Sequence, residues 1–325
     1  MKKQTYRLIK SLAGIIIAAA FYYYLYRLSV PHFQNIKELE QITDFNNFGF
    51  KYLFMALFLC LPNWILESAK WQTAVMPIEK ITIKTAIKGV LRGVPPSTFT
   101  PNRIGETVGR ATVLQPSNRV QGAFATAYCG ISQMPVMAMS AAAGALWFML
   151  QGVNIQNASF ITSWWFAAAF AIIAAAAAAI FYKPTALIPA AKNRWQRLTA
   201  KLEFFGSYTP AAKHRIIIIS TLRYCVYCIQ NYLLLKTFGI NIGIADGMTA
   251  VFVIYGIISF VPRPALAELG VRCSVSAVVL QPFTQNPLVP AASSAVLWII
   301  NILIPCIIGT VLYFVSKKSE KIFAD

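Results

Sequence analysis

The chain has 325 residues, of which 57% are hydrophobic and only 12% are charged. Soluble domains average about 25% charged residues, so this composition excludes a soluble globular protein and indicates an integral membrane protein. The net charge of +18 comes mainly from basic residues in short loops beside apolar segments, which favours topology signals and contacts with anionic headgroups over nucleic-acid binding.

Seven apolar stretches are long enough to cross a membrane as helices. They are residues 8–30, 49–69, 120–150, 158–182, 214–236, 244–262 and 290–316. The first follows a basic N-terminus and resembles a signal peptide. No small-residue cleavage site follows it, so we interpret it as a retained first helix.

The distribution of Lys and Arg predicts the orientation of these helices. The N-terminus, the loops at 70–92 and 183–215, and the tail after residue 316 are basic, and they should face the cytoplasm. The loop at 151–158 is uncharged and should be external. We therefore expect a multi-pass protein of the cell inner (cytoplasmic) membrane with both termini in the cytoplasm.

Two segments do not fit a simple alternation of crossings. Residues 78–118 must begin and end inside, which predicts a surface segment or a re-entrant helical hairpin with its tip at 95–101. Residues 265–282 must cross outward, but they are few and charged, which predicts a broken or half-length helix. The expected fold is an all-α polytopic membrane protein with about eight crossings, forming one domain over residues 1–325.

A charged motif follows the expected tip of the hairpin. Pro95 and Pro96 should stop a helix, and Pro101 should begin the next one with Thr100 as its N-cap. The free N–H groups of that helix start would face an anion. Hydroxyls of Ser97, Thr98 and Thr100 would complete a pocket for a phosphate.

Three charged residues follow within the same motif. Arg103 can hold a phosphate with two hydrogen bonds. Glu106 lies one turn later on the face of Arg103 and Arg110, where it can neutralise the arginines or meet a cationic amine. Charges beside apolar runs usually mark a substrate path. The alternative is that Glu106 and Arg110 merely pair at the cytoplasmic surface.

A second motif repeats this pattern in the other half of the chain. Arg263 stands between two prolines, and Glu268 and Arg272 are four residues apart. Glu106 and Glu268 lie about half a chain length apart, which suggests an internally duplicated transporter with repeat halves at about 1–185 and 190–325. We expect both motifs to line one substrate cavity.

Other polar residues in apolar segments have two interpretations each. Arg223 lies in the stretch at 214–236 and either lines the same cavity or extends to the cytoplasmic interface. Glu67 and Lys70 end the stretch at 49–69 and are expected at the membrane interface. Six cysteines lie in or beside apolar segments and only two histidines are present, so we expect small apolar packing, no metal site and no cofactor.

The segment Pro101-Asn102-Arg103-Ile104-Gly105-Glu106, with Arg110 after it, resembles the signature of the lysylphosphatidylglycerol synthase transmembrane region family, also called flippase-like or UPF0104 proteins. The segment from Glu268 to Arg272 resembles the second motif of that family. The resemblance implies a lipid-translocating membrane region. Full-length synthases add a soluble aminoacyl-transfer domain, which we expect this chain to lack.

The leading hypothesis is a translocase that moves a polar or charged-headgroup phospholipid, such as an aminoacylated or related lipid, between leaflets. Its partners would be the phospholipid substrate and membrane lipids, without nucleic acid, and a homo-oligomer remains open. The alternatives are a membrane-embedded lipid-linked transferase and a transporter of a soluble anionic solute. Acidic residues in the predicted external loops lack metal-ligand spacing, so an enzyme is not expected.

Overall fold

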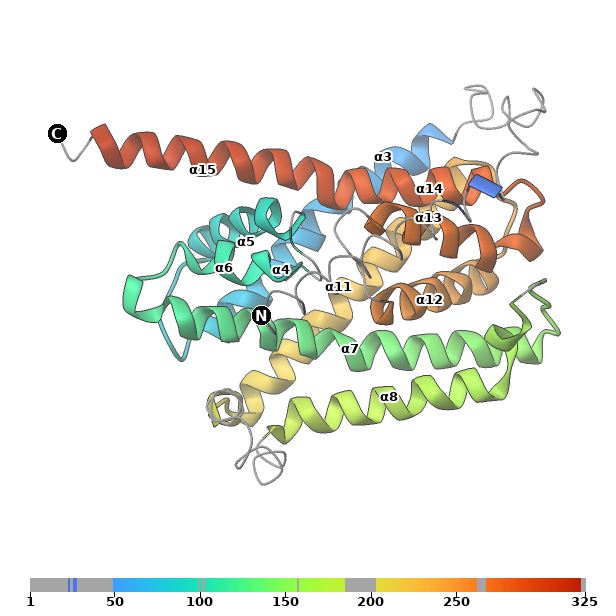
Figure 1. The fold of residues 1–325 in the computed structure, drawn as a ribbon, viewed down its shortest axis with the longest axis horizontal. Coiled ribbons are helices and arrows are strands. Elements are labelled where there is room, and N and C mark those ends of the chain that lie inside the picture. Colours follow the sequence, from blue (N-terminus) through green and yellow to red (C-terminus); the bar gives the residue numbers. More distant parts are fainter. Residues whose placement is uncertain are drawn as a thin grey trace, which may run out of the picture. The chain divides into compact units, whose positions relative to one another are not determined.

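Figure 1 shows the computed structural model of the chain. The structure describes residues 49–98, 100, 103–156, 158–184, 203–261 and 267–322, together with Tyr23, Tyr26 and Arg27. These described residues form helices joined by turns, without a β-strand among them. The predicted all-α fold is therefore confirmed. Most of the predicted helix at 8–30 lies outside the described residues.

The helices follow the predicted order along the chain. The α-helices are α3 (Phe50–Phe58), α4 (Cys60–Val75), α5 (Ile83–Thr98), α6 (Gly105–Ala111), α7 (Arg119–Leu150), α8 (Trp164–Tyr182), α11 (Pro210–Thr237), α12 (Ile244–Phe260), α13 (Glu268–Val279), α14 (Leu288–Trp298) and α15 (Ile304–Ile322). Short 3-10 turns lie at Pro116–Asn118, Ser159–Thr162 and Gln281–Phe283, and a π-helical turn at Ile299–Leu303 joins α14 to α15.

Five helical segments of the described chain are long and apolar enough to cross a membrane. They are Phe50–Val75, Pro116–Leu150, Trp164–Tyr182, Pro210–Thr237 and Leu288–Val315. The protein is thus a multi-pass membrane protein. α12 is apolar but shorter, and α13 has only 12 residues, or about 18 Å against a hydrocarbon core of about 30 Å. The predicted half-length helix is α13, and the number of crossings stays a prediction.

The chain folds as two units, each assembled from segments that are distant in sequence. Unit 1 comprises Met1–Leu59, Ser140–Phe170 and Tyr227–Ile300. Unit 2 comprises Cys60–Met139, Ala171–Val226 and Asn301–Asp325. Each unit draws on both halves of the sequence, because α7, α8 and α11 each pass from one unit into the other. Each charged motif lies within a single unit.

In unit 2, α5 and α6 pack together as a helical hairpin (Figure 1), which is one of the two arrangements predicted for residues 78–118. Glycine allows their close approach. A Cβ atom at Gly105 would lie 2.1 Å from the Pro96 carbonyl oxygen, and one at Gly109 would lie 2.6 Å from that of Arg92. Real Cβ atoms do not approach backbone so closely, so only glycine fits these two positions.

The prediction that Pro95 and Pro96 stop a helix is wrong, because both lie inside α5. Each proline lacks an N–H, which frees the carbonyl four residues earlier. Those carbonyls, of Leu91 and Arg92, lie against glycines of neighbouring helices. A Cβ atom at Gly309 of α15 would lie 2.1 Å from the Leu91 oxygen. The prolines are tolerated near the helix end, where close neighbours surround the freed carbonyls.

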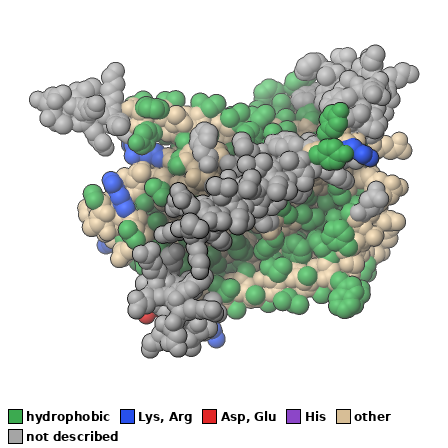
Figure 2. Space-filling view, in the orientation of Figure 1, with side chains coloured by type: hydrophobic (Ala, Val, Ile, Leu, Met, Phe, Trp, Pro, Cys, Tyr) green, Lys and Arg blue, Asp and Glu red, His purple; other side chains and the backbone are tan. Residues whose placement is uncertain are grey.

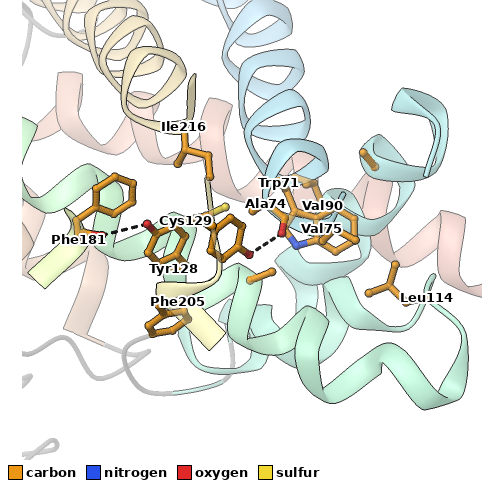
Figure 3. Packing of buried hydrophobic residues seen from close by; sticks show 13 residues of the cluster. Trp71, Ala74, Val75, Val90, Leu114, Tyr128, Cys129, Phe181, Phe205 and Ile216 are labelled. Carbon is orange, nitrogen blue, oxygen red and sulfur yellow. Dashed lines mark hydrogen bonds between the residues drawn. The ribbon is translucent and has the colours of Figure 1, made fainter. Parts of the chain in front are cut away.

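An aromatic core anchors the end of α4 in unit 2 (Figure 3). The Tyr128 ring stacks on Phe181 and on Tyr208, each with ring centroids 4.6 Å apart. The Tyr208 hydroxyl donates to the Ala74 carbonyl at 2.6 Å, and Trp71 is fully buried in the same cluster. This packing keeps α4 helical to Val75, six residues beyond the predicted end of its apolar stretch.

In unit 1, α13 packs between α12 and α14 (Figure 1). The second half of α7 approaches α12 through small residues. A Cβ atom at Gly144 would lie 2.8 Å from the Thr249 oxygen, and one at Gly256 would lie 2.2 Å from the Ala141 Cβ. Small residues at such contacts are typical of helix packing in membranes.

Apolar side chains cover much of the described surface in Figure 2. The exposed apolar residues of the described chain include Phe58 of α3, Ile172 of α8 and Phe314 of α15, which are each more than 60% exposed. A soluble protein would rarely present so many large apolar groups. Contact with lipid acyl chains accounts for them.

Candidate substrate-binding sites

Glu67 of α4 is the centre of a buried charge cluster in unit 2. Its Oε2 lies 2.8 Å from Lys70 Nζ and 3.1 Å from Arg223 Nε. Its Oε1 accepts a hydrogen bond from Arg110 Nη2 at 2.7 Å. One carboxylate thus joins cations from α4, α6 and α11.

Glu106 extends this cluster along α6. It pairs with Arg110 one turn later, and its Oε2 lies 3.5 Å from Arg103 Nε. The cluster therefore contains six charged side chains, which we call the unit 2 charge cluster. They are Glu67, Lys70, Arg103, Glu106, Arg110 and Arg223.

The unit 2 charge cluster has a buried inner part and an outer part. The side chains of Glu67, Lys70 and Arg110 are 6%, 2% and 3% exposed. Those of Arg103 and Arg223 are 30% and 22% exposed. A ligand entering from the surface of unit 2 would meet these two arginines before Arg110.

Gln133 of α7 connects two of the cations. Its Oε1 accepts a hydrogen bond from Arg223 Nη1 at 2.8 Å and another from Lys70 Nζ at 3.3 Å. A neutral amide oxygen can accept both without adding charge. Gln133 therefore positions Lys70 and Arg223 without neutralising them.

The charges of the cluster do not balance. Among the described residues, four cations face two carboxylates, which leaves a formal excess of two positive charges. In addition, Nε and Nη1 of Arg110 are buried without a hydrogen-bond acceptor. Buried donors without an acceptor are costly. An anion that brings both charge and acceptor oxygens would complement these side chains.

The backbone at the hairpin tip presents Arg103 to this cluster. Arg103 has φ of +58°, a left-handed conformation that is uncommon outside glycine and often occurs at functional sites. Its Nη2 donates to Ser97 Oγ at 3.3 Å. Arg103 is thereby turned back across the end of α5 towards Glu106.

The predicted helix start at Pro101, with Thr100 as its N-cap, falls on a residue outside the described structure. α6 begins at Gly105, and the Thr100 hydroxyl accepts a hydrogen bond from the Gly105 N–H at 2.7 Å. Because α6 has only seven residues, the arginine side chains, rather than a helix terminus, provide the attraction for an anion. Pro101 and Asn102 lie outside the described residues.

The three predicted hydroxyls hold the end of α5 together. Those of Ser97, Thr98 and Thr100 donate to the carbonyls of Val94, Pro95 and Pro96, at 2.7, 2.7 and 2.8 Å. Ser97 also touches Arg103, as described above. Thr98 and Thr100 keep the hairpin in shape, and no contact of theirs reaches the charge cluster in the described structure.

The second motif forms a separate pair within unit 1. Glu268 Oε1 accepts from Arg272 Nη2 at 3.0 Å and lies 3.4 Å from its Nε. Both residues are buried. Arg272 Nη1 donates to the Tyr227 hydroxyl at 3.2 Å, and the rings of Tyr227 and Tyr255 lie 4.6 Å apart. Arg263 lies outside the described residues.

Several predictions about these residues can now be compared with their positions. Ser97, Arg103, Glu106, Arg110 and Arg223 come together in unit 2, where Arg223 pairs with Glu67 and donates to Gln133. Glu67 and Lys70 were expected at the membrane interface, where water would solvate them, but both are buried inside unit 2. Among the described residues, no group of three potential metal ligands comes together.

Comparison with known protein families gives one match, to the lysylphosphatidylglycerol synthase TM region, over residues 11–309. The chain belongs to this family. The resemblance seen in the segment from Pro101 to Arg110 is confirmed. No curated protein sequence matches the chain.

Membership of the lysylphosphatidylglycerol synthase transmembrane region family indicates a membrane protein of the flippase-like kind. The matched residues include the whole unit 2 charge cluster and the Glu268–Arg272 pair. The short family signature in the hairpin contains three residues of the unit 2 charge cluster, Arg103, Glu106 and Arg110. Glu67, Lys70 and Arg223 come from α4 and α11.

Proposed function

We propose that the protein is a translocase that moves a phospholipid with a polar or charged headgroup, such as an aminoacylated or related lipid, between membrane leaflets. The observation that carries this proposal is the unit 2 charge cluster, with its excess of positive charge and the unpartnered N–H groups of Arg110. A lipid phosphate would supply the missing acceptors. Family membership supports the proposal.

Each charged residue of the cluster has a proposed part in binding. The partly exposed Arg103 and Arg223 would contact the phosphate first, and Arg110 would hold it deeper in unit 2. Glu67 and Glu106 would keep the arginines in place and limit their attraction when the site is empty. Such limited attraction matters, because a translocase must release its substrate in the opposite leaflet.

The Glu268–Arg272 pair would provide a second headgroup contact. Arg272 is fixed by both Glu268 and the Tyr227 hydroxyl. A buried arginine held on two sides loses little freedom when it binds an anion. We propose that unit 1 takes part in transport through this pair, with no chemical change in the lipid.

We also propose the location and orientation of the protein. The basic segments support a location in the cell inner membrane with both termini in the cytoplasm. Its partners would be the transported phospholipid and the surrounding lipids, and a homo-oligomer is compatible with this role. Labelling of single cysteines introduced in the loops at 70–92 and 151–158 would test the orientation, since only the second loop should react from outside.

Leaflet exchange in liposomes tests the proposed function. The purified protein would be reconstituted with labelled lipids that differ only in headgroup. We expect headgroup-dependent exchange that Arg103→Ala and Glu106→Gln both abolish. Arg119→Gln is the matched control, because Arg119 is exposed and donates to the Leu114 carbonyl, outside the charge cluster.

Two results would contradict the proposal. Folded protein that exchanges no lipid but takes up a soluble anion would indicate a solute transporter, because the charge cluster would serve either substrate. Conversion of a labelled lipid donor by the purified protein would indicate a lipid-linked transferase. Exchange at the same rate in Arg103→Ala and wild type would remove the charge cluster from the mechanism.

A further inference from the structure

The unit 2 charge cluster also carries information about the charge of its ligand. We propose that it prefers a phosphate monoester, which carries two negative charges, over a phosphodiester, which carries one. This inference rests on the proposed function, since it concerns the same site, and it narrows the class of lipid that the site takes. It follows from the net charge of the ion-paired residues, from the donors of Arg110 that lack acceptors, and from the pairing of both carboxylates with cations.

The side chains of the unit 2 charge cluster carry a net positive formal charge. Lys70, Arg103, Arg110 and Arg223 outnumber Glu67 and Glu106 by two. Uncompensated charge inside a protein is costly. A monoester dianion would bring the occupied site to formal neutrality, whereas a phosphodiester would leave one positive charge without a partner.

The arginine donors of the cluster require several acceptor oxygens. Nε and Nη1 of Arg110 both lack an acceptor and are buried. Arg103 and Arg223 can add donors from the outer part of the cluster, where each is partly exposed. A monoester presents three terminal oxygens, while a phosphodiester has two, because its other two oxygens are esterified. Three arginines are matched better by three oxygens.

A cationic group of a lipid headgroup does not suit this cluster. Glu67 is already paired with Lys70, Arg110 and Arg223, and Glu106 with Arg103 and Arg110. Both carboxylates are thus already engaged with cations, which disfavours a further ammonium group beside Glu106. The amine of an aminoacylated headgroup would add positive charge to a site that is already positive.

A pair of lipids that differ in a single methyl ester tests the preference. Phosphatidic acid is a monoester, and phosphatidylmethanol with the same acyl chains is its methyl phosphodiester. Binding of each to the full chain in detergent micelles at neutral pH would be measured by native mass spectrometry. We expect phosphatidic acid to bind at least about tenfold more tightly, because one additional charge–charge attraction is gained in a buried site.

Variants then connect the preference to the cluster. Arg223→Gln reduces the excess to one positive charge and should lower the ratio of the two affinities to near one, while Arg119→Gln should leave the ratio unchanged. Arg110→Gln should weaken binding of both lipids. If Arg110→Gln does not fold, Arg223→Gln still tests the proposal, since the Arg223 side chain is partly exposed.

Equal affinity of the wild type for the two lipids would overturn the inference, as would a ratio that Arg223→Gln leaves unchanged. If inorganic phosphate displaces phosphatidic acid at similar concentrations and dimethyl phosphate, a soluble phosphodiester, does so less well, the preference for a dianion stands but its source is a soluble ion. Preferential binding without leaflet exchange would refute the translocase and keep this inference. Leaflet exchange without a preference for phosphatidic acid would refute this inference and keep the translocase.

Discussion

The two Glu–Arg pairs of this protein share a sequence pattern but not an environment. In unit 2, Arg110 contacts Glu106 and also Glu67, which brings Lys70 and Arg223 into the same cluster. In unit 1, Arg272 contacts Glu268 and the hydroxyl of Tyr227. The spacing of four residues creates the pair, but residues from other helices decide whether the site carries an excess of charge.

This difference predicts different roles for the two sites. The unit 2 charge cluster has donors that still require acceptors, so it is suited to binding an anion. In the Glu268–Arg272 pair, the arginine donates to the carboxylate of Glu268 and to the hydroxyl of Tyr227. Four substitutions would break or sharpen this comparison, beginning with the one that should have the largest effect.

Replacing Glu67 by Gln should destabilise the protein most. The change keeps the size of the side chain but leaves the four cations of the cluster with Glu106 as their remaining carboxylate among the described residues, and breaking a buried ion pair costs about 3–5 kcal/mol. Thermal unfolding in detergent would measure the loss, with Glu268→Gln as the comparison in unit 1. If Glu268→Gln lowers the stability as much as Glu67→Gln does, the three ion pairs of Glu67 do not make it more important than Glu268 for stability.

Replacing Gly105 by Ala should distort the α5–α6 hairpin that presents Arg103. The added Cβ would lie 2.1 Å from the Pro96 oxygen, and overpacking of this kind costs about 1–3 kcal/mol. Gly130→Ala in α7 is the matched control, because a Cβ there has no neighbour within 4 Å. Unfolding midpoints would be compared, and an equal shift for both variants would contradict the close packing of α6 on α5.

Replacing Gln133 by Glu should weaken anion binding without loss of fold. The new carboxylate would pair with Lys70 and Arg223 and reduce the formal excess of the cluster from two positive charges to one. We expect binding of phosphatidic acid to fall about tenfold, equivalent to about 1.4 kcal/mol. Native mass spectrometry would measure it, and unchanged affinity would show that the net charge of the cluster does not govern binding.

Replacing Tyr227 by Phe should have the smallest effect. It removes the hydroxyl that accepts a hydrogen bond from Arg272, which costs about 1–2 kcal/mol for a bond to a charged group. Binding of lipid phosphate to the unit 2 charge cluster should not change. Thermal unfolding and lipid binding, measured beside Tyr232→Phe, would separate the two effects. A loss of phosphate binding in Tyr227→Phe alone would contradict the assignment of the anion site to unit 2.

The sequence determined the class of the protein and most of its helices. Long apolar stretches predict membrane helices because lipid requires every backbone polar group to bond within the segment. The positions of α7, α11 and α12 were therefore predicted to within a few residues. The parity of the basic loops also predicted the α5–α6 hairpin and the short α13, and the charged signature pointed to Arg103, Glu106 and Arg110.

The tertiary structure decided which charges meet. Glu67 and Lys70 stand at the edge of an apolar stretch, where a sequence gives no reason to prefer burial over a position at the interface. The aromatic core around Trp71 extends α4 and buries them, and α6 and α11 then supply Arg110 and Arg223 as partners. An ion pair forms only between groups that are close in space. Glu67, Arg110 and Arg223 are far apart in the sequence, and they come close only when α4, α6 and α11 pack together.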